Sequence, residues 1–421
     1  MGLIKIIIEG MENRLKHRQL HPKKRSDELF YEVMIKYYKR VYEAKEENKP
    51  LVWCSPLIGP ELLYSMDIVP FFPELVGMAI GNIADIRTYF EACSGWGIPD
   101  DVCSVHRSAI GMALKGEFPT PDLVINSSHC CDSSFKTFQT LNSLYDCPEF
   151  MVDAPYFYNQ EGIEYYKQEL QRLIDFLEEH LRRKIDYDRL KETLILTKRA
   201  TDAYIEISEL RKAVPTPMHG RDGIKNYGLF YEGVGTEEMI RYLEAIKDEL
   251  REKVSHGEGA IEDERYRICW LYVTPGPWLR IFDWMEQEYG AIVAMETFTY
   301  MITQEIDLQK PLDSLARKAM HYPVMRQYHG PVENIVNDHL RMLREYQADA
   351  AIAVAPPGCK QFCASLKILR DVTRQKTGTP LLIIDADGLD PTSMSQGEFQ
   401  AKLEEFFEML EERGQLLNTL R

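Results

Sequence analysis

An alternation of short apolar runs with longer amphipathic segments constrains the fold of this chain more than any other feature. The apolar runs are four to seven residues long, rich in Val, Ile, Leu and Ala, and bounded mostly by Pro, Gly, Asn or Ser. Such runs are typical of parallel strands that are buried on both faces. Because parallel strands need crossover connections, and segments of helical period lie between the runs, the pattern predicts an α/β protein with right-handed crossovers.

The predicted strands fall into two groups, one in each half of the chain. The first group is 51–54, 122–128 and 149–153, and the second is 268–274, 291–295, 351–355 and 380–385. Charged amphipathic helices are predicted between the groups, at 162–182, 187–213 and 236–252. The Pro- and Gly-containing stretch 215–235 indicates a break in this helical section. We interpret 321–330 as a surface loop.

These patterns divide the chain into four parts. We predict a helical N-terminal segment (1–50), a first α/β domain (51–160), a helical bridge (161–260) and a second α/β domain with a C-terminal helix (261–421). A length of 421 residues is consistent with more than one domain. In open α/β sheets, functional sites form at the carboxyl ends of the strands, so two such domains that face each other would share a site in the cleft between them.

The charge and hydropathy of the chain argue against two classes of partner. The net charge is −16 and no long run of Lys or Arg is present, which argues against binding to nucleic acid or to anionic membrane surfaces. The apolar run Leu3–Ile8 is too short for a signal peptide, and no stretch approaches the ~20 apolar residues of a membrane span. We therefore expect a cytoplasmic protein whose cysteines are reduced.

Six of the nine cysteines form three pairs, each in a context rich in Gly, Pro or Ser. The pairs are Cys93/Cys103, Cys130/Cys131 and Cys359/Cys363. We interpret Cys54, Cys269 and Cys147 as core residues, because free cysteine is often buried as a small hydrophobe. A zinc site would favour short spacings such as CxxC, which do not occur in this sequence.

Two of the cysteine pairs follow predicted strands directly. Cys130 and Cys131 come just after strand 122–128, and Cys359 comes just after strand 351–355, at the start of a helix. Thiolates are the ligands of iron–sulfur clusters, and loops and helix N-termini stabilise their negative charge. The sequence therefore favours an iron–sulfur cluster in the cleft between the two domains. Buried thiols, a zinc site and redox-active thiols remain as alternatives.

The segments around these cysteines resemble a known superfamily. They are WCSPLIGPELLYSMDIVPFFPE (53–74), DLVINSSHCCDSSFKTF (122–138), RICWLYVTPGPW (267–278) and DAAIAVAPPGCKQFCASLKILRD (349–371). They look like the 2-hydroxyacyl-CoA dehydratase / benzoyl-CoA reductase superfamily, over roughly 25–415. The resemblance implies two flavodoxin-like or Rossmann-like α/β domains. In the dehydratase branch it implies a 4Fe-4S cluster held by three cysteines, matched here by one of Cys93/Cys103, one of Cys130/Cys131, and Cys359.

The chain departs from the dehydratase branch because each single cysteine has become a pair. This doubling is similar to the double-cubane cluster proteins of the same superfamily, which carry an 8Fe-9S cluster. The resemblance then implies a homodimer that is reduced by a separate ATP-hydrolysing iron–sulfur activator. It also implies low-potential reduction of a small-molecule substrate rather than of a CoA ester. ATP itself is not expected on this chain, which lacks a GxxxxGK(S/T) loop.

Three further side chains are candidate catalytic groups. His129 lies beside a cysteine pair, His106 lies three residues after Cys103, and Glu296 follows strand 291–295. Each is a candidate proton donor, and Arg107 is a candidate to balance the negative charge of a cluster.

Two rival functions remain open beside the double-cubane reductase. One is a 4Fe-4S subunit of a 2-hydroxyacyl-CoA dehydratase or benzoyl-CoA reductase. The other is an electron carrier or cluster-storage protein, which would need less scaffold than two large domains.

Overall fold

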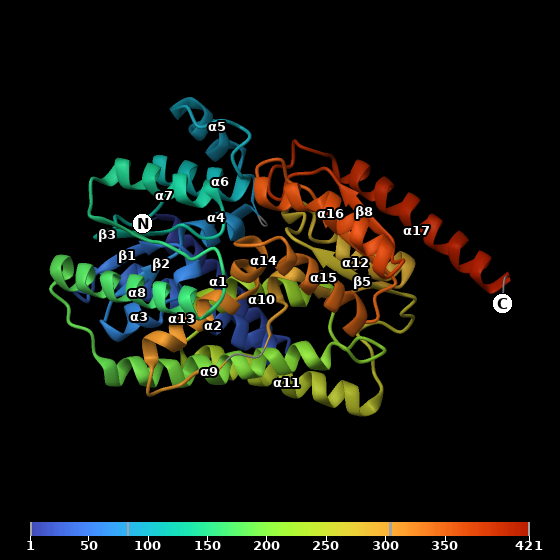
Figure 1. Ribbon diagram of the computed structural model, residues 1–421, viewed down its shortest axis with the longest axis horizontal. Coiled ribbons are helices and arrows are strands. Elements are labelled where there is room, and N and C mark those ends of the chain that lie inside the picture. Colours follow the sequence, from blue (N-terminus) through green and yellow to red (C-terminus); the bar gives the residue numbers. More distant parts are fainter. Residues whose placement is uncertain (1, 82–83, 303–304, 420–421) are drawn as a thin grey trace.

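Two four-stranded parallel sheets organise the computed structural model, which describes residues 2–81, 84–302 and 305–419 (Figure 1). The first sheet has the order β2-β1-β3-β4, formed by Val69–Phe71, Leu51–Cys54, Leu123–Ser127 and Glu149–Val152. The second has the order β6-β5-β7-β8, formed by Ala291–Glu296, Tyr266–Leu271, Ala350–Val354 and Leu381–Ile384. All strand pairings are parallel. The predicted fold class is confirmed.

The two sheets are wound in the same way. In each, the first strand of the unit lies between the second and the third, which is the flavodoxin-like order. The chain reverses its direction of winding between β1 and β3 in the first sheet, and between β5 and β7 in the second. Ligand sites of open α/β sheets form at this switch point, beyond the carboxyl ends of the strands. The winding therefore fixes where each unit offers a site.

Helices cover both sheets. In the first half they are α1 (Gly2–Leu20), α2 (Arg25–Glu43), η1 (Pro56–Ile58), α3 (Glu61–Ser65), α4 (Pro73–Gly81), α5 (Arg87–Trp96), α6 (Ser104–Leu114) and α7 (Asp132–Tyr145). The middle section holds α8 (Gln160–Leu181), α9 (Tyr187–Leu210), α10 (Gly220–Gly233) and α11 (Glu237–His256). The second half holds η2 (Gly276–Trp278), α12 (Ile281–Tyr289), η3 (Thr297–Thr299), α13 (Pro311–His321), α14 (Pro323–Tyr328), α15 (Glu333–Glu345), α16 (Lys360–Lys376) and α17 (Gln396–Thr419).

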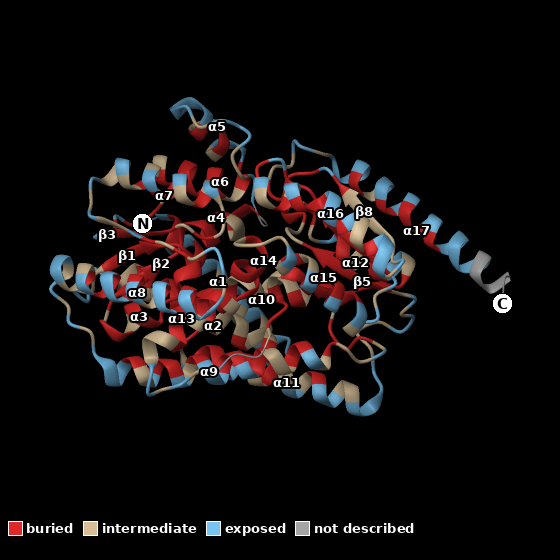
Figure 2. Ribbon diagram, in the orientation of Figure 1, coloured by how far each residue is buried: buried red, intermediate tan, exposed pale blue. Residues whose placement is uncertain are grey.

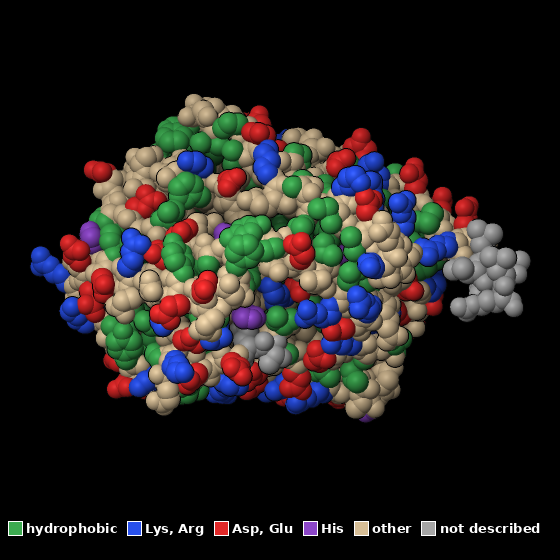
Figure 3. Space-filling model, in the orientation of Figure 1, with side chains coloured by type: hydrophobic (Ala, Val, Ile, Leu, Met, Phe, Trp, Pro, Cys, Tyr) green, Lys and Arg blue, Asp and Glu red, His purple; other side chains and the backbone are tan. Residues whose placement is uncertain are grey.

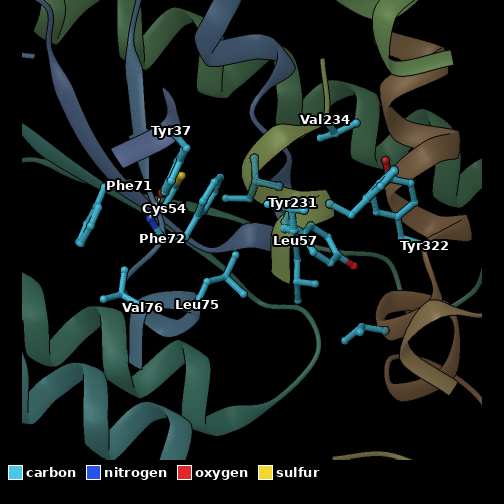
Figure 4. Close-up of a cluster of buried hydrophobic side chains, with 14 of the residues drawn as sticks. Tyr37, Cys54, Leu57, Phe71, Phe72, Leu75, Val76, Tyr231, Val234 and Tyr322 are labelled. Atoms are coloured by element: carbon cyan, nitrogen blue, oxygen red, sulfur yellow. Dashed lines mark hydrogen bonds between the residues drawn. The ribbon is translucent and has the colours of Figure 1, made fainter. Parts of the chain in front are cut away.

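The core of the first unit is aromatic and includes one of the cysteines that we interpreted as structural. Helix α2 packs on this core, where the ring of Tyr37 stacks on Phe72 and its hydroxyl accepts a hydrogen bond from the Phe72 amide. Figure 4 shows Cys54 beside these two rings. Cys54 and its counterpart Cys269 in the second sheet are fully buried, which confirms their interpretation as core residues, whereas Cys147 is only half-buried. Figure 2 shows buried residues in both units.

The predicted break at 215–235 is wrong, because α10 spans most of it. Its glycines permit close packing rather than a turn. A Cβ at Gly220 would lie 2.7 Å from the Cβ of Val293, and one at Gly223 would lie 2.6 Å from the Glu296 carboxylate. Helix α10 therefore lies directly against β6 only because these positions lack side chains.

The predicted surface loop at 321–330 is also wrong. Residues 323–328 form α14, and every one of them is buried. Pro323 occupies the first turn, where its missing N–H costs nothing. Arg326 lies 2.6 Å from Asp338, so its charge is neutralised inside the protein. A polar and aromatic composition was misread as exposed because the ion-pair partner of Arg326, Asp338, lies on another helix, α15.

Charged side chains of both signs are interspersed on the face shown in Figure 3. Within the described part of the chain, no helix has the length and apolar character needed to cross a membrane.

The two α/β units meet beside the paired cysteines. Lys360 at the start of α16 lies 3.3 Å from Asp101 of the first unit, and Arg107 on α6 lies 3.7 Å from Asp390 of the second. Between these ion pairs the backbones come into close contact, because a Cβ at Gly358 would lie 2.5 Å from the Cα of Cys103. The boundaries proposed at 50, 160 and 260 stay predictions.

We predict that Gly358→Ala destabilises the protein by about 1–3 kcal/mol, the usual range for overpacking. The added methyl meets backbone atoms, which cannot move aside as a flexible side chain can. Gly397→Ala is the matched control, because a Cβ at Gly397 meets no atom within 4 Å. Urea unfolding measures both variants. Equal midpoints for the two variants would contradict the close contact.

Candidate functional site

A cavity of about 110 Å³ lies in the cleft between the carboxyl ends of the two sheets. Four of the six paired cysteines line it: Cys103, Cys130, Cys131 and Cys359. The first three come from the first unit and Cys359 comes from the second. The residues between these sulfurs are mainly apolar or aromatic. We call this space the cysteine cavity.

Three of these cysteines occupy the same structural position, directly before the first residue of a helix. Cys103 precedes α6, Cys131 precedes α7 and Cys359 precedes α16. The amide of Ser134 in the first turn of α7 donates a hydrogen bond to the Cys131 sulfur at 3.4 Å. Backbone hydrogen bonds from the first turns of α6 and α16 reach the other two sulfurs. Three positive helix ends thus converge on one cavity, an arrangement that stabilises thiolates and anionic groups.

Three thiols at this cavity, those of Cys103, Cys131 and Cys359, are not activated as free nucleophiles. Withdrawal from water raises the pKa of Cys103 well above its ordinary value, and nearby Cys359 and Cys131 raise it further. Burial likewise raises the pKa of Cys359 to about 12. Redox-active cysteines show the opposite shift, so the geometry disfavours that alternative. Coordination to a metal centre would deprotonate these thiols outright.

The spacing of the ligands disfavours a single metal ion. Across the residues that the structure describes, no three His, Cys, Asp or Glu side chains are grouped closely enough to hold one ion. A zinc ion needs its thiolates about 2.3 Å from one point. An iron–sulfur cluster is larger, so its cysteines stand farther apart around a cavity. Sulfur donors around a water-excluded space, with helix N-termini directed at it, fit a cluster.

Tyr272 was missed by the sequence analysis, yet its side chain contacts a candidate ligand. Its hydroxyl donates a hydrogen bond to the Cys359 sulfur at 2.6 Å, and its ring stacks on Phe362 at 4.3 Å. The residue follows β5 and has a φ of 70°, which is unfavourable for a bulky side chain. The Thr297 hydroxyl holds this backbone by accepting from the Tyr272 amide at 2.8 Å. Strain of this kind is often retained at functional sites.

The remaining two cysteines lie outside the cavity. Cys363 is one turn beyond Cys359 on α16, and its thiol donates to the Pro356 carbonyl at 3.2 Å. Cys93 is buried on α5, where its thiol donates to the carbonyl of Arg107 at 2.9 Å. Figure 1 shows α5 at the edge of the molecule, beside α6. The structure therefore brings one member of each pair to the cavity, together with Cys130.

Glu74 is a second residue that the sequence analysis missed. It is buried on α4, lines the cysteine cavity, and accepts a hydrogen bond from the Ser134 hydroxyl at 2.8 Å. Burial raises the pKa of its carboxyl to about 7, although the bond from Ser134 opposes the shift. His106, which we predicted as catalytic, lies 3.3 Å from Glu74 through Nδ1 and 3.6 Å from the Cys131 sulfur through Nε2. A carboxyl that titrates near neutrality thus faces the cavity beside a histidine.

The other predicted catalytic residues lie elsewhere. His129 is buried and its Nδ1 is in hydrogen-bond contact with the Ser127 hydroxyl. Burial lowers its pKa, and the ring stands 5.6 Å from that of His329 rather than in the cavity wall. Glu296 is held in a buried ion pair with Arg211, at 2.6 Å and 3.0 Å. No sequence signal distinguished this paired carboxylate from Glu74.

Arg107 is close to the cleft without touching its sulfurs. Its guanidinium pairs with Asp100 at 2.8 Å and stacks over the ring of Phe90. Through Asp390 it also joins the two units. In the structure it therefore fastens the loop that carries Cys103.

Comparison with known proteins supports the resemblance noted from the cysteine segments. The family model for the 2-hydroxyglutaryl-CoA dehydratase D-component matches residues 58–410, well over half of the chain. The chain belongs to this family. The match covers both parallel sheets apart from β1, together with every paired cysteine.

Several curated relatives match along nearly their whole length. A benzoyl-CoA reductase component from Thauera aromatica is 25% identical over 91% of this chain and 94% of its own length. The alpha subunit of (R)-phenyllactyl-CoA dehydratase from Clostridium sporogenes is 22% identical over 92% of this chain and 96% of its own. The alpha subunit of (R)-2-hydroxyisocaproyl-CoA dehydratase from Clostridioides difficile is 21% identical, over 94% and 98%. All three are named as subunits of enzymes, so the family is one of enzyme components.

We predict that Tyr272→Phe lowers the reduction potential of the bound cluster while iron is retained. Hydrogen bonds to ligand sulfurs stabilise the more negative, reduced state, so removing one makes reduction harder. Tyr328→Phe is the matched control, because its hydroxyl lies in the same cavity but donates to Thr297 at 3.1 Å. Anaerobic potentiometric titration followed by electron paramagnetic resonance measures both. An unchanged potential in Tyr272→Phe would contradict the role assigned to this bond.

Proposed function

We propose that this chain is the iron–sulfur component of an ATP-dependent reductase and carries an 8Fe-9S double-cubane cluster. On this proposal it is a cytoplasmic homodimer that receives low-potential electrons from a separate ATP-hydrolysing activator and reduces a small molecule. The observation that carries the proposal is the convergence of three cysteines at three helix N-termini on one interdomain cavity. Each of the three has a second cysteine close by in sequence, and this doubling favours two cubanes over one.

The cysteines and their surroundings define what the protein would contribute. Cys103, Cys131 and Cys359 would hold the cluster, with Cys130, Cys93 and Cys363 as the additional ligands of a double cubane. Bound there, the cluster would supply low-potential electrons to a substrate in the cavity. The chain excludes water with aromatic and apolar side chains and places the positive ends of three helices at the anionic group.

Glu74 is the side chain best placed to supply protons. Addition of electrons to a neutral molecule creates negative charge that a nearby acid must quench. The Glu74 carboxyl lines the cavity, and burial raises its pKa to about 7, so it can carry a proton near neutral pH. His106 lies between this carboxyl and the Cys131 sulfur and can hold the proton in transit.

A second candidate function is supported by two further hollows. A chamber of about 260 Å³ adjoins the cysteine cavity, and an outer hollow of about 1090 Å³ adjoins the chamber. Charges of both signs line the outer hollow, and among the described residues three of its cations form no ion pair: Arg14, Arg18 and Lys23. Unpaired cations at the mouth of an apolar passage suit a long ligand with an anionic head. This favours a CoA ester, as named for the relatives, and a 4Fe-4S subunit of a dehydratase or CoA-ester reductase.

Iron counting distinguishes the two functions. We predict about eight irons per chain after anaerobic purification, and a marked loss of iron in Cys363→Ala and Cys93→Ala. Cys269→Ala should keep all of its iron, because that thiol is buried in the second sheet away from the cleft. About four irons, retained in both Cys363→Ala and Cys93→Ala, would instead support the single-cluster function with CoA esters as substrates.

The role of Glu74 gives a pH dependence with a defined sign. The acid is active when protonated, so the reduction rate should be constant at pH values well below the Glu74 pKa of about 7 and fall as pH rises through it. Glu74→Gln should lower the rate about 10²–10⁴-fold, the usual value of a general acid, and abolish this alkaline decline. Glu232→Gln is the matched control, because burial also raises the pKa of this carboxyl, to about 8, but it lies in the chamber and accepts a hydrogen bond from Tyr38. A decline with pH that persists in Glu74→Gln would assign the proton to another group.

A further inference from the structure

The chamber and the cysteine cavity share part of their lining. Seven residues line both spaces: Leu75, Met78, Val105, Tyr227, Tyr272, Val273 and Phe298. We call these seven residues the partition. The chamber in turn shares Arg14, Phe30 and Tyr31, among others, with the outer hollow. A molecule that enters from the outer hollow therefore meets the partition before it meets a cysteine.

One side of the partition is rigid. Tyr227 stacks on Phe298 with ring centroids 4.7 Å apart, and Phe298 makes an edge contact with Tyr272 at 5.1 Å. Tyr272 is further fixed by its stack on Phe362 and by its hydrogen bond to Cys359. Aromatic rings in such contacts have few alternative rotamers. This side therefore acts as a fixed edge.

Met78 is the movable member of the partition. Met78 on α4 is half-buried, and its unbranched side chain adapts easily to neighbouring shapes. Across from it, Gly228 on α10 has no side chain, and a Cβ there would lie 3.3 Å from the Met78 methyl carbon and 4.0 Å from Leu75. The absence of a side chain at Gly228 leaves the end of Met78 free to move within the chamber.

The charges around the chamber are mostly neutralised. Glu296 pairs with Arg211, Arg221 with Asp283 and Lys225 with Asp222. The partition itself has no charged member. An ion that crossed it would lose its hydration without gaining a partner, which is costly. Small uncharged molecules do not face this barrier.

We propose that the partition is a size and charge filter, in which Met78 moves against the Tyr227–Phe298 edge and Gly228 provides the room for that movement. Small uncharged molecules pass from the chamber to the cysteine cavity, and bulky or charged groups are held in the chamber. This inference rests on the proposed function, because it specifies which substrates would reach the cluster. Gly228 and Met78 are thereby residues that determine specificity without touching the sulfurs.

Alkylation of the full-length chain after anaerobic removal of iron tests the filter independently of activity. N-ethylmaleimide is the small probe and N-(1-pyrenyl)maleimide the bulky one, and mass spectrometry follows the labelling of Cys130 and Cys131. Half-buried Cys147, outside the cavity, is the reference thiol, and labelling of the fully buried Cys54 would reveal unfolding.

Two variants change the filter in opposite directions. Gly228→Val should slow labelling of the cavity cysteines by N-ethylmaleimide about tenfold, because the added methyl groups push Met78 into the passage. Met78→Ala should let the bulky probe react faster. Gly10→Val is the matched control, because a Cβ at Gly10 on α1 meets no atom within 4 Å. Equal labelling rates in Gly228→Val and Gly10→Val would overturn the proposal.

The iron-loaded protein provides a second test. With the activator and ATP, terminal alkynes of increasing length serve as uncharged probes, each taking up two electrons and two protons to give an alkene. Gly228→Val should lower kcat/KM more for long alkynes than for short ones. Met78→Ala should instead raise kcat/KM more for long alkynes than for short ones. If no alkyne is reduced by any form while the labelling rates change as expected, the proposed function fails and the filter stands. If alkynes are reduced with the same length dependence in all forms, the filter fails and the function stands.

Discussion

The cost of ionising cysteine thiols in a mainly apolar interdomain cleft is the constraint on which the candidate site depends. Burial raises the pKa of the Cys103 and Cys359 thiols, and contact with Cys130 followed by burial raises that of Cys131, so ionisation is unfavourable unless positive charge is supplied. The chain provides part of it with backbone dipoles, because each cysteine precedes a helix whose free amides face the sulfur. A bound metal cluster would supply the remainder. Among the described residues, no lysine or arginine lines the cavity for that purpose.

The two sheets have the same strand order, and this shared order explains how three helix N-termini meet at one cavity. Each sheet has its switch point between its first and third strands, and in each the loop after the third strand leads a cysteine into a helix. The two switch points face each other because the units are pressed together at Gly358 and Cys103, with an ion pair on either side. The close approach of two backbones thus sets the width of the cleft. The position of α6 adds the third cysteine from the edge of the first unit.

The candidate acid and the candidate filter are residues with no proposed role in holding a cluster. Glu74 lies on α4, and Met78 lies one turn later on the same helix. Both residues line the cysteine cavity, and Met78 also lines the chamber. A single short helix therefore carries the candidate acid and the movable part of the candidate filter. Its position against α6 places both beside the sulfurs.

The sequence by itself determined the α/β class, the two groups of strands and the three cysteine pairs, because strand burial and helical period leave local patterns that need no tertiary contacts. It misread 215–235 and 321–330, where glycines and polar residues serve packing partners that are distant in sequence. Only the tertiary structure decided that Glu74 rather than Glu296 faces the cavity. Both are acidic residues near strand ends, but Arg211 neutralises Glu296, whereas among the described residues no cation pairs with Glu74 apart from a neighbouring histidine. Whether a carboxyl is an ion-pair partner or a proton donor depends on which charges the fold brings beside it.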